Sequence, residues 1–364
     1  MILHFYFARR FLKFFLSIFT VFALFLGLVD LVEQLRRFDE TVSFGQVVQI
    51  TLLKLPEGLY TILPLVMILA TVALCISLAR SSELVVSRAA GRSGLAALMG
   101  PVGVALALAL LAVAMLNPIV AATSKRAADL DEAWRNDSGS VLSIGPEGLW
   151  LRQGGPEGQI VIRAARTNPD ASVLYDVTFV DYTAEGGPER RIEAEEARLS
   201  GGDWLLTKAK QWPLTAGLNP ETGSESYDEL RLPSTLTQDG IRDRFGEPSA
   251  IPVWELPRFI RGLEEAGFSA RRHVVWLQME LAQPVFLVAM VLVAAGFTMR
   301  PSRLGRTGVA VLSSILLGFG LYYIRNFAQI LGENGQLNPI VAAWIPPVAS
   351  LLLALGLVLQ MEEG

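Results

Sequence analysis

Long runs of apolar residues, separated by polar segments, make up most of the chain. Six of these runs come close to the roughly twenty residues that an α-helix needs to cross a hydrocarbon core of about 30 Å. They cover approximately residues 11–32, 59–79, 95–118, 274–298, 307–331 and 339–360. The pattern therefore predicts a polytopic α-helical membrane protein whose six transmembrane helices form two groups of three.

The first apolar run is longer than the core of a signal peptide. Charged residues follow it, among them Asp30, Glu33 and Arg36, where a signal peptide would have a small-residue cleavage site. We therefore expect this run to remain in the protein as a membrane anchor.

Between the third and fourth runs lies a mostly polar insertion, residues 123–272. Within it, apolar and polar positions alternate, as at Tyr175, Asp176, Val177 and Thr178, and Gly- and Pro-rich turns separate the runs. This is strand periodicity at spacings suited to an antiparallel sandwich or barrel. The predicted organisation is transmembrane helices 1–3 in 1–122, an all-β domain in 123–272 and helices 4–6 in 273–364, with a linker helix at about 254–267.

Basic residues favour one orientation, because Lys and Arg are retained on the cytoplasmic side of a membrane. With the N-terminus inside, each cytoplasmic segment carries three of them. These are Arg9, Arg10 and Lys13, then Arg80, Arg88 and Arg92, then Arg300, Arg303 and Arg306. This orientation places both termini in the cytoplasm and the insertion outside it.

The charge of the chain is unevenly distributed. The insertion holds 18 basic and 25 acidic residues, whereas the rest of the chain has a net charge of +3. An acidic exported domain argues against nucleic acid as a partner. The single cysteine, Cys75, lies in the second apolar run and excludes an intrachain disulfide.

Motifs for catalysis are missing from the sequence. It contains no Gly-x-x-x-x-Gly-Lys-Ser/Thr phosphate loop and no Gly-x-Ser-x-Gly elbow, and His4 and His273 have no metal-ligand spacing around them. We expect no active site and no cofactor of the chain's own, so that any ATP is bound by a partner.

The cytoplasmic segment 80–94 is the best candidate for contact with such a partner. Ser81 or Ser82 is suited to cap a short helix, Glu83 lies in its first turn near the positive end of the helix dipole, and Gly91 is suited to end it. Apolar residues at 84–86 and the charges of Glu83 and Arg88 would fit a groove on a soluble ATPase. The alternative is an ordinary loop with basic topology residues.

The same segment carries a family resemblance. Arg80-Ser81-Ser82-Glu83-Leu84-Val85-Val86, followed by Ala89-Ala90-Gly91, resembles the coupling-helix signature of the LptF/LptG permease family, nearer to its LptG branch. The six predicted spans, the inserted domain and Gln34-Leu35-Arg36-Arg37 extend the resemblance over essentially the whole chain.

The resemblance implies a permease subunit in the bacterial inner membrane, paired with an LptF-like chain and powered by an LptB-like ATPase dimer. It would extract lipopolysaccharide from the outer leaflet and pass it through a periplasmic jellyroll-like domain to LptC and LptA-like relay proteins. The coupling helix would span about 82–91. Its implied contact residues are Ser82, Glu83, Leu84, Val85, Arg88 and Gly91, with Glu83 carrying the contact to the ATPase.

Phosphate groups of the glycolipid would require cations at the outer face. Arg36 and Arg37 at the outer end of the first span fit this role, and Lys125 and Arg126 beyond the third span are further candidates, since guanidinium groups bind phosphate in a bidentate way. For Arg36 and Arg37 the alternative is a pair of helix-surface ion pairs with Glu33.

Arg325 lies inside the fifth span, where a charge needs a partner or an aqueous cavity. Asp30, at a comparable depth in the first span, is a candidate counter-ion, either for Arg325 or for a basic gate residue of the partner permease. The family often has a basic residue near the level of Asp30, so this chain departs from its pattern there. The alternative for Arg325 is that its side chain extends to the headgroups.

Two other functions remain compatible with the sequence. The chain could be the LptF-like paralogue of the same exporter, or a mechanotransmitting ABC subunit that regulates an envelope process without moving lipid. An intramembrane enzyme is disfavoured because no buried nucleophile, metal or acid–base cluster is present.

Overall fold

The computed structural model describes most of the chain in two compact units. The residues outside the description are 1, 38–41, 84, 85, 87, 88, 90, 92, 135–141, 146, 147, 156, 157, 169–171, 184–186, 215–218, 235, 237–246, 266, 267, 300–306 and 364. The helical unit comprises Met1–Leu130, Pro252–Trp254 and Arg271–Gly364, and the β unit comprises Asp131–Ile251 and Glu255–Ala270.

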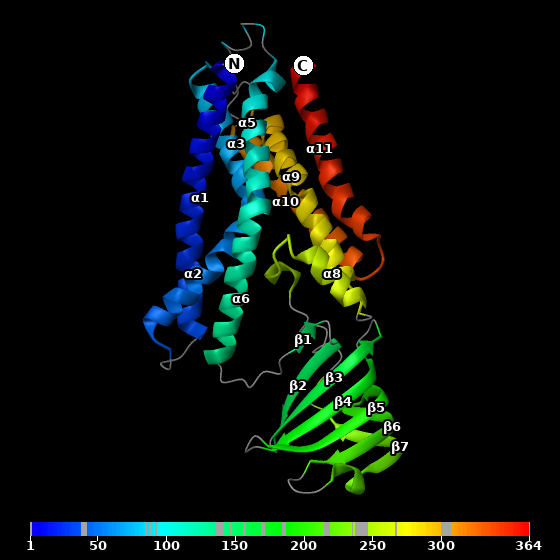
Figure 1. Cartoon of the computed structure of the whole chain (residues 1–364). Helices are drawn as coiled ribbons and strands as arrows, with labels where there is room; N and C mark the ends of the chain where they lie inside the picture. The colour runs from blue at the N-terminus through cyan, green and yellow to red at the C-terminus, as the bar shows by residue number, and fades with distance from the viewer. Residues whose placement is uncertain are drawn as a thin grey trace. The chain divides into compact units, whose positions relative to one another are not determined.

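Long helices form the helical unit (Figure 1). They are α1 (Ile2–Arg37), α2 (Phe44–Thr61), α3 (Leu63–Arg80), α5 (Gly94–Leu111), the π-helical turn η1 (Ala112–Leu116), α6 (Asn117–Trp134), α9 (Arg271–Thr298), α10 (Thr307–Glu333) and α11 (Pro339–Glu363). Among the described residues, six segments are long and apolar enough to cross a membrane. This confirms the six predicted spans, and both chain ends lie at the same end of the bundle (Figure 1).

Local sequence sets where several helices begin and end. Pro64 occupies the first turn of α3, where its missing N–H leaves no hydrogen bond broken, and Ser93 accepts a hydrogen bond from the Ala96 N–H at 3.0 Å to cap α5. The third span continues without a break through α5, η1 and α6. Residues 123–130, assigned from sequence to the insertion, therefore belong by their contacts to the helical unit.

Helix α9 forms the centre of the bundle. Its most apolar window is 78% buried, and it packs against α3, α5, α10 and α11. By contrast, the corresponding window of α1 is only 6% buried. An apolar helix with so little burial within its own chain faces lipid or another subunit.

The β unit contains one continuous antiparallel sheet. Its described strands pair in chain order, and the sheet is curved (Figure 1). They are β1 (Leu142–Gly145), β2 (Gly148–Gly155), β3 (Gly158–Thr167), β4 (Val173–Thr183), β5 (Pro188–Ser200), β6 (Asp203–Pro213) and β7 (Glu225–Pro233). The inserted all-β domain is thus confirmed, although its described strands form one sheet and not the two packed sheets of a sandwich.

One face of this sheet is apolar and buried. Leu151, Ile162, Phe179 and Ile192 stand opposite one another on neighbouring strands, and each is at most 2% exposed. Alternation along each strand sends the polar residues to the other face. The predicted linker helix is α8 (Leu256–Glu265), which buries Leu256, Ile260 and Leu263.

Candidate functional site: an ion-pair network and a buried charge cluster

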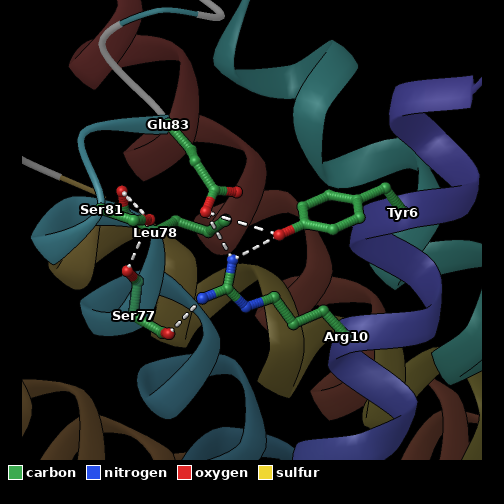
Figure 2. A network of polar contacts seen from close by, with 6 residues as sticks. All are labelled: Tyr6, Arg10, Ser77, Leu78, Ser81 and Glu83. Carbon is green, nitrogen blue, oxygen red and sulfur yellow. Dashed lines mark hydrogen bonds and ion pairs between the residues drawn. The ribbon is translucent and has the colours of Figure 1, made fainter.

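A network of polar contacts joins the beginning of α1 to the end of α3 (Figure 2). The Arg10 guanidinium donates to Glu83 Oε1 at 2.8 Å through Nη1 and to Ser77 Oγ at 2.6 Å through Nη2. Nη1 also donates to the Tyr6 hydroxyl at 2.9 Å. Arg10 therefore connects one residue of α3, one residue beyond α3 and one residue of its own helix.

Helix periodicity brings these groups together. Tyr6 and Arg10 are four residues apart and lie on one face of α1, and the Arg10 guanidinium lies 5.8 Å from the centre of the Tyr6 ring. Ser77 and Ser81 have the same spacing, and the Ser81 hydroxyl donates to the Ser77 carbonyl at 3.0 Å. The pairing across the two helices is tertiary, since Arg10 and Glu83 are 73 positions apart.

The environment of Glu83 favours its charged form. Burial raises the pKa of the carboxyl group, but the hydrogen bonds from Arg10, Ser81 and Tyr6 and the charge of Arg10 outweigh this effect. The pKa of Glu83 is therefore lower than its ordinary value, and the group is a carboxylate at neutral pH.

The segment after α3 turns sharply into the predicted coupling helix. Ser82 has a φ of 55°, a left-handed conformation that is uncommon for residues other than glycine, and its carbonyl accepts from the Val86 N–H at 3.1 Å. Gly91 has a φ of 75°, as expected for a residue that ends a helix. The predicted contact residues Leu84, Val85 and Arg88 lie outside the described residues, whereas Val86 is 66% exposed.

The predicted lipid-facing cations are exposed where the structure describes them. Arg36 and Arg37 lie in the last turn of α1, and Lys125 and Arg126 lie on α6. The sequence suggested a basic partner for Asp30. In the structure its Oδ1 accepts instead from Gln34 Nε2 at 3.1 Å. Asp30 Oδ2 is buried and has no hydrogen-bond partner in the described part of the chain.

Arg325 of α10 is 8% exposed, and its charge faces Glu280 of α9. Its Nη2 donates to the Met279 carbonyl at 3.3 Å, and its guanidinium lies 5.0 Å from the centre of the Phe286 ring. The structure thus brings Arg325 together with Glu280 and not with Asp30. The Arg325 side chain is thus largely enclosed by the helical unit.

Glu280 is 3% exposed and has further polar neighbours. The hydroxyl of Tyr60, at the end of α2, donates to its Oε2. The side chain of Asn117, the first residue of α6, interacts electrostatically with both Glu280 and Tyr60. Residues from four helices therefore meet in one buried polar cluster, consisting of Tyr60, Asn117, Glu280 and Arg325.

Sequence reasoning named Glu83 and Arg325 but missed their partners. A signal for Glu280 was present, because it is the one charged residue of the apolar run 274–298 and buried charges within a span are usually paired. Arg10 was counted only as a topology residue. Tyr60 and Asn117 carry no pattern that distinguishes them from other polar residues near span ends.

An apolar groove lies between α3 and α10. It has a volume of about 210 Å³. Thr61, Ile62, Pro64, Leu65, Ile68, Gly318, Phe319 and Tyr322 line it. A Cβ atom at Gly318 would lie 2.2 Å from Ile68 Cδ1, so this glycine permits the close approach of the two helices. The lining of the groove is mainly apolar.

Comparison with known proteins assigns a family to this arrangement. Residues 5–360 match the family described as the lipopolysaccharide export system permease LptF/LptG. The lipopolysaccharide export system permease protein LptG of Escherichia coli K12 is 26% identical over 352 residues, which cover 92% of this chain and 91% of that protein. LptG of Haemophilus influenzae is 25% identical over 331 residues, with 90% and 88% covered.

Proposed function

The chain belongs to the LptF/LptG family of lipopolysaccharide export permeases, and we propose that it is the LptG-like permease subunit of an ATP-driven exporter. Its six apolar helices and its LptG relatives indicate an inner-membrane protein. The observation that carries the proposal is the match over residues 5–360, which includes the helices, the inserted β domain and the segment around Glu83.

In this proposal the energy comes from a partner ATPase dimer that contacts the coupling segment. Glu83 lies at the start of this segment and is already bonded to Arg10 of α1. Because α1 is one uninterrupted helix of 36 residues, about 54 Å long, a displacement at its cytoplasmic end is passed to its outer end at Arg36 and Arg37. Two partners, the ATPase and Arg10, would share the two oxygens of one carboxylate.

The substrate path would begin at the outer leaflet. The exposed cations Arg36, Arg37, Lys125 and Arg126 would attract the phosphate groups of lipopolysaccharide, and the groove between α3 and α10 would accept acyl chains. Narrowing of the cavity between this chain and an LptF-like partner would then move the glycolipid towards the β domain. From there it would pass to LptC and LptA-like proteins in the periplasm.

Mass spectrometry of the complex purified through a tag on this chain, in mild detergent, tests the proposal. An LptF-like chain, two copies of an LptB-like ATPase and bound lipopolysaccharide are expected. An ATPase without glycolipid and without a second six-span chain would contradict the proposal, and would favour the mechanotransmitting subunit instead.

A further inference from the structure

The β unit is interrupted by a short segment that belongs to the helical unit. The chain leaves the β unit after Ile251, contacts the helical unit through Pro252–Trp254, and rejoins the β unit at Glu255. We call Pro252–Trp254 the strap.

Two hydrogen bonds fasten the strap to the third span. The backbone N–H of Val253 donates to Asn117 Oδ1 at 2.9 Å, and the indole N–H of Trp254 donates to the Ala114 carbonyl at 3.1 Å. Ala114 lies within the π-helical turn η1. Such turns interrupt the α-helical hydrogen-bond pattern and recur at functional sites. Here the turn presents a backbone carbonyl to the strap.

The contact between the strap and Asn117, which we call the joint, is shielded from water at its centre. Val253 is 4% exposed and Asn117 is 2% exposed. A buried N–H left without an acceptor carries a free-energy penalty, so loss of Asn117 as acceptor favours opening of this contact. Trp254 covers the edge of the joint and is itself 68% exposed.

Asn117 links the strap to the buried charge cluster. Its oxygen accepts from Val253, and its side chain also interacts electrostatically with Glu280 and Tyr60. Glu280 in turn faces Arg325 on α10. The Arg325 guanidinium also donates to the Met279 carbonyl, next to Glu280, so α10 is bonded to α9 beside this cluster.

We propose that Asn117 is a positioning residue for lipid export, which holds the strap and Glu280 together so that a displacement of α9 or α10 is passed to the chain where it returns to the β unit. This rests on the proposed export function. A residue that only stabilised the bundle would affect lipid release and ATP hydrolysis alike, whereas a positioning residue changes the ratio between them.

The test compares Asn117→Leu, which removes the amide group and keeps the number of side-chain heavy atoms, with Asn117→Gln, which keeps both polar groups. Thr71→Val is the matched control, because Thr71 is a fully buried polar residue whose hydroxyl donates, within the described part of the chain, to the Met67 carbonyl of its own helix. Hydrogen exchange of the Val253 amide and lipopolysaccharide released per ATP hydrolysed are both measured on the whole complex in proteoliposomes.

For Asn117→Leu we expect Val253 exchange to be at least tenfold faster, and lipid released per ATP to fall about fivefold or more at an ATPase rate within twofold of wild type. Asn117→Gln should recover part of both, and Thr71→Val should change neither. An unprotected Val253 amide in the wild-type protein, or fast exchange in Asn117→Leu with an unchanged ratio of lipid to ATP, would overturn the proposal.

Two possible failures remain distinguishable. If Asn117→Leu does not fold, Trp254→Phe, which removes the indole N–H together with the five-membered ring, should still accelerate Val253 exchange and lower the ratio; no change in either would overturn the proposal. If the wild-type complex releases no lipopolysaccharide, the export function fails, and the positioning role of Asn117 in export fails with it. Val253 exchange in Asn117→Leu would then show whether the joint itself exists.

Discussion

At the scale of single residues, the carboxylate of Glu83 joins two helices that are distant in sequence. It accepts from Arg10 of α1, and Arg10 also donates to Ser77 of α3. Both charged side chains are about three-quarters to two-thirds covered by protein, with exposed fractions of 24% and 31%. Because the pair is partly buried, the attraction between its charges is less screened by water than in most surface pairs, but more screened than in a fully buried pair.

A double-mutant cycle should detect the pair directly. Arg10→Ala and Glu83→Ala are each expected to destabilise the helical unit, and the double variant should be more stable than the sum of the single effects by about 0.5–1 kcal/mol. Thermal unfolding of the purified chain in detergent provides the measurement. Additive single effects would show that the two side chains do not interact.

The same pair predicts a pH dependence. Because the pKa of Glu83 is lowered in the folded protein, the stabilisation is present above the unfolded value of 4.5 and is lost as the pH falls through the lower folded value. The difference in unfolding temperature between the wild-type protein and Glu83→Gln should therefore be constant from pH 7 to about pH 5 and should shrink at lower pH. A difference that stays constant down to pH 3 would contradict the lowered pKa.

Glu83 could be identified from the sequence alone, because the position of a charged residue at the start of a short segment between two spans can be read directly from the order of residues. It could not identify Arg10 as the partner, because only the packing of α1 on α3 brings positions 73 residues apart into contact. The same reason explains Arg325, whose burial was predictable but whose counter-ion, Glu280, depends on how α9 and α10 pack.

At the scale of elements, the helices approach one another closely where glycine replaces a larger side chain. Gly100 of α5 faces α1, and a Cβ atom there would lie 2.3 Å from the His4 carbonyl oxygen. Gly103, one turn further along α5, has no atom within 4 Å of the corresponding position. The two glycines therefore form a natural pair of test and control.

Gly100→Ala should destabilise the helical unit by about 1–3 kcal/mol, because the clash is with backbone that cannot move aside without separating α1 from α5. Gly103→Ala should be neutral or slightly stabilising, since alanine is the better helix former. Unfolding temperatures of both variants in detergent give the comparison. Equal effects of the two substitutions would show that α1 and α5 do not pack at this distance.

The pairing of α9 with α10 gives a second test at this scale. Glu280→Leu leaves Arg325 buried without a counter-ion and should cost about 3–5 kcal/mol, whereas Glu280→Leu combined with Arg325→Leu should recover most of that loss. Asp30→Leu combined with Arg325→Leu serves as the control and should show additive effects. If the double variant of Asp30 and Arg325 showed non-additive effects and that of Glu280 and Arg325 did not, Asp30 would be the counter-ion of Arg325, as considered from the sequence.

Elements were the part of the structure that sequence predicted best. Apolar runs of about twenty residues and alternating strands depend on local composition, so the six spans and the inserted β domain were predictable. The strap was not, because its hydrogen bonds join segments more than a hundred residues apart. The π-helical turn at Ala112–Leu116 was not either, because no sequence pattern distinguishes it from the α-helix around it.

At the scale of the whole molecule, the features described above belong to one family of lipopolysaccharide export permeases. The helical unit contains the polar network at Glu83 and the buried cluster at Glu280, and α1 and the third span extend from one end of the bundle towards the other (Figure 1). In our proposal, the network at Glu83 receives the movement of the ATPase. The cluster at Glu280 passes this movement through the strap to the chain that returns to the β unit.

The most direct test is ATP-dependent release of lipopolysaccharide from proteoliposomes that contain this chain with its partner permease and ATPase. The wild-type complex should release lipid to an added periplasmic acceptor only when ATP is hydrolysed. The Glu83→Ala complex should still bind lipid but release at least several-fold less of it. Absence of ATP-dependent release by the wild-type complex, or wild-type release by Glu83→Ala, would contradict the account.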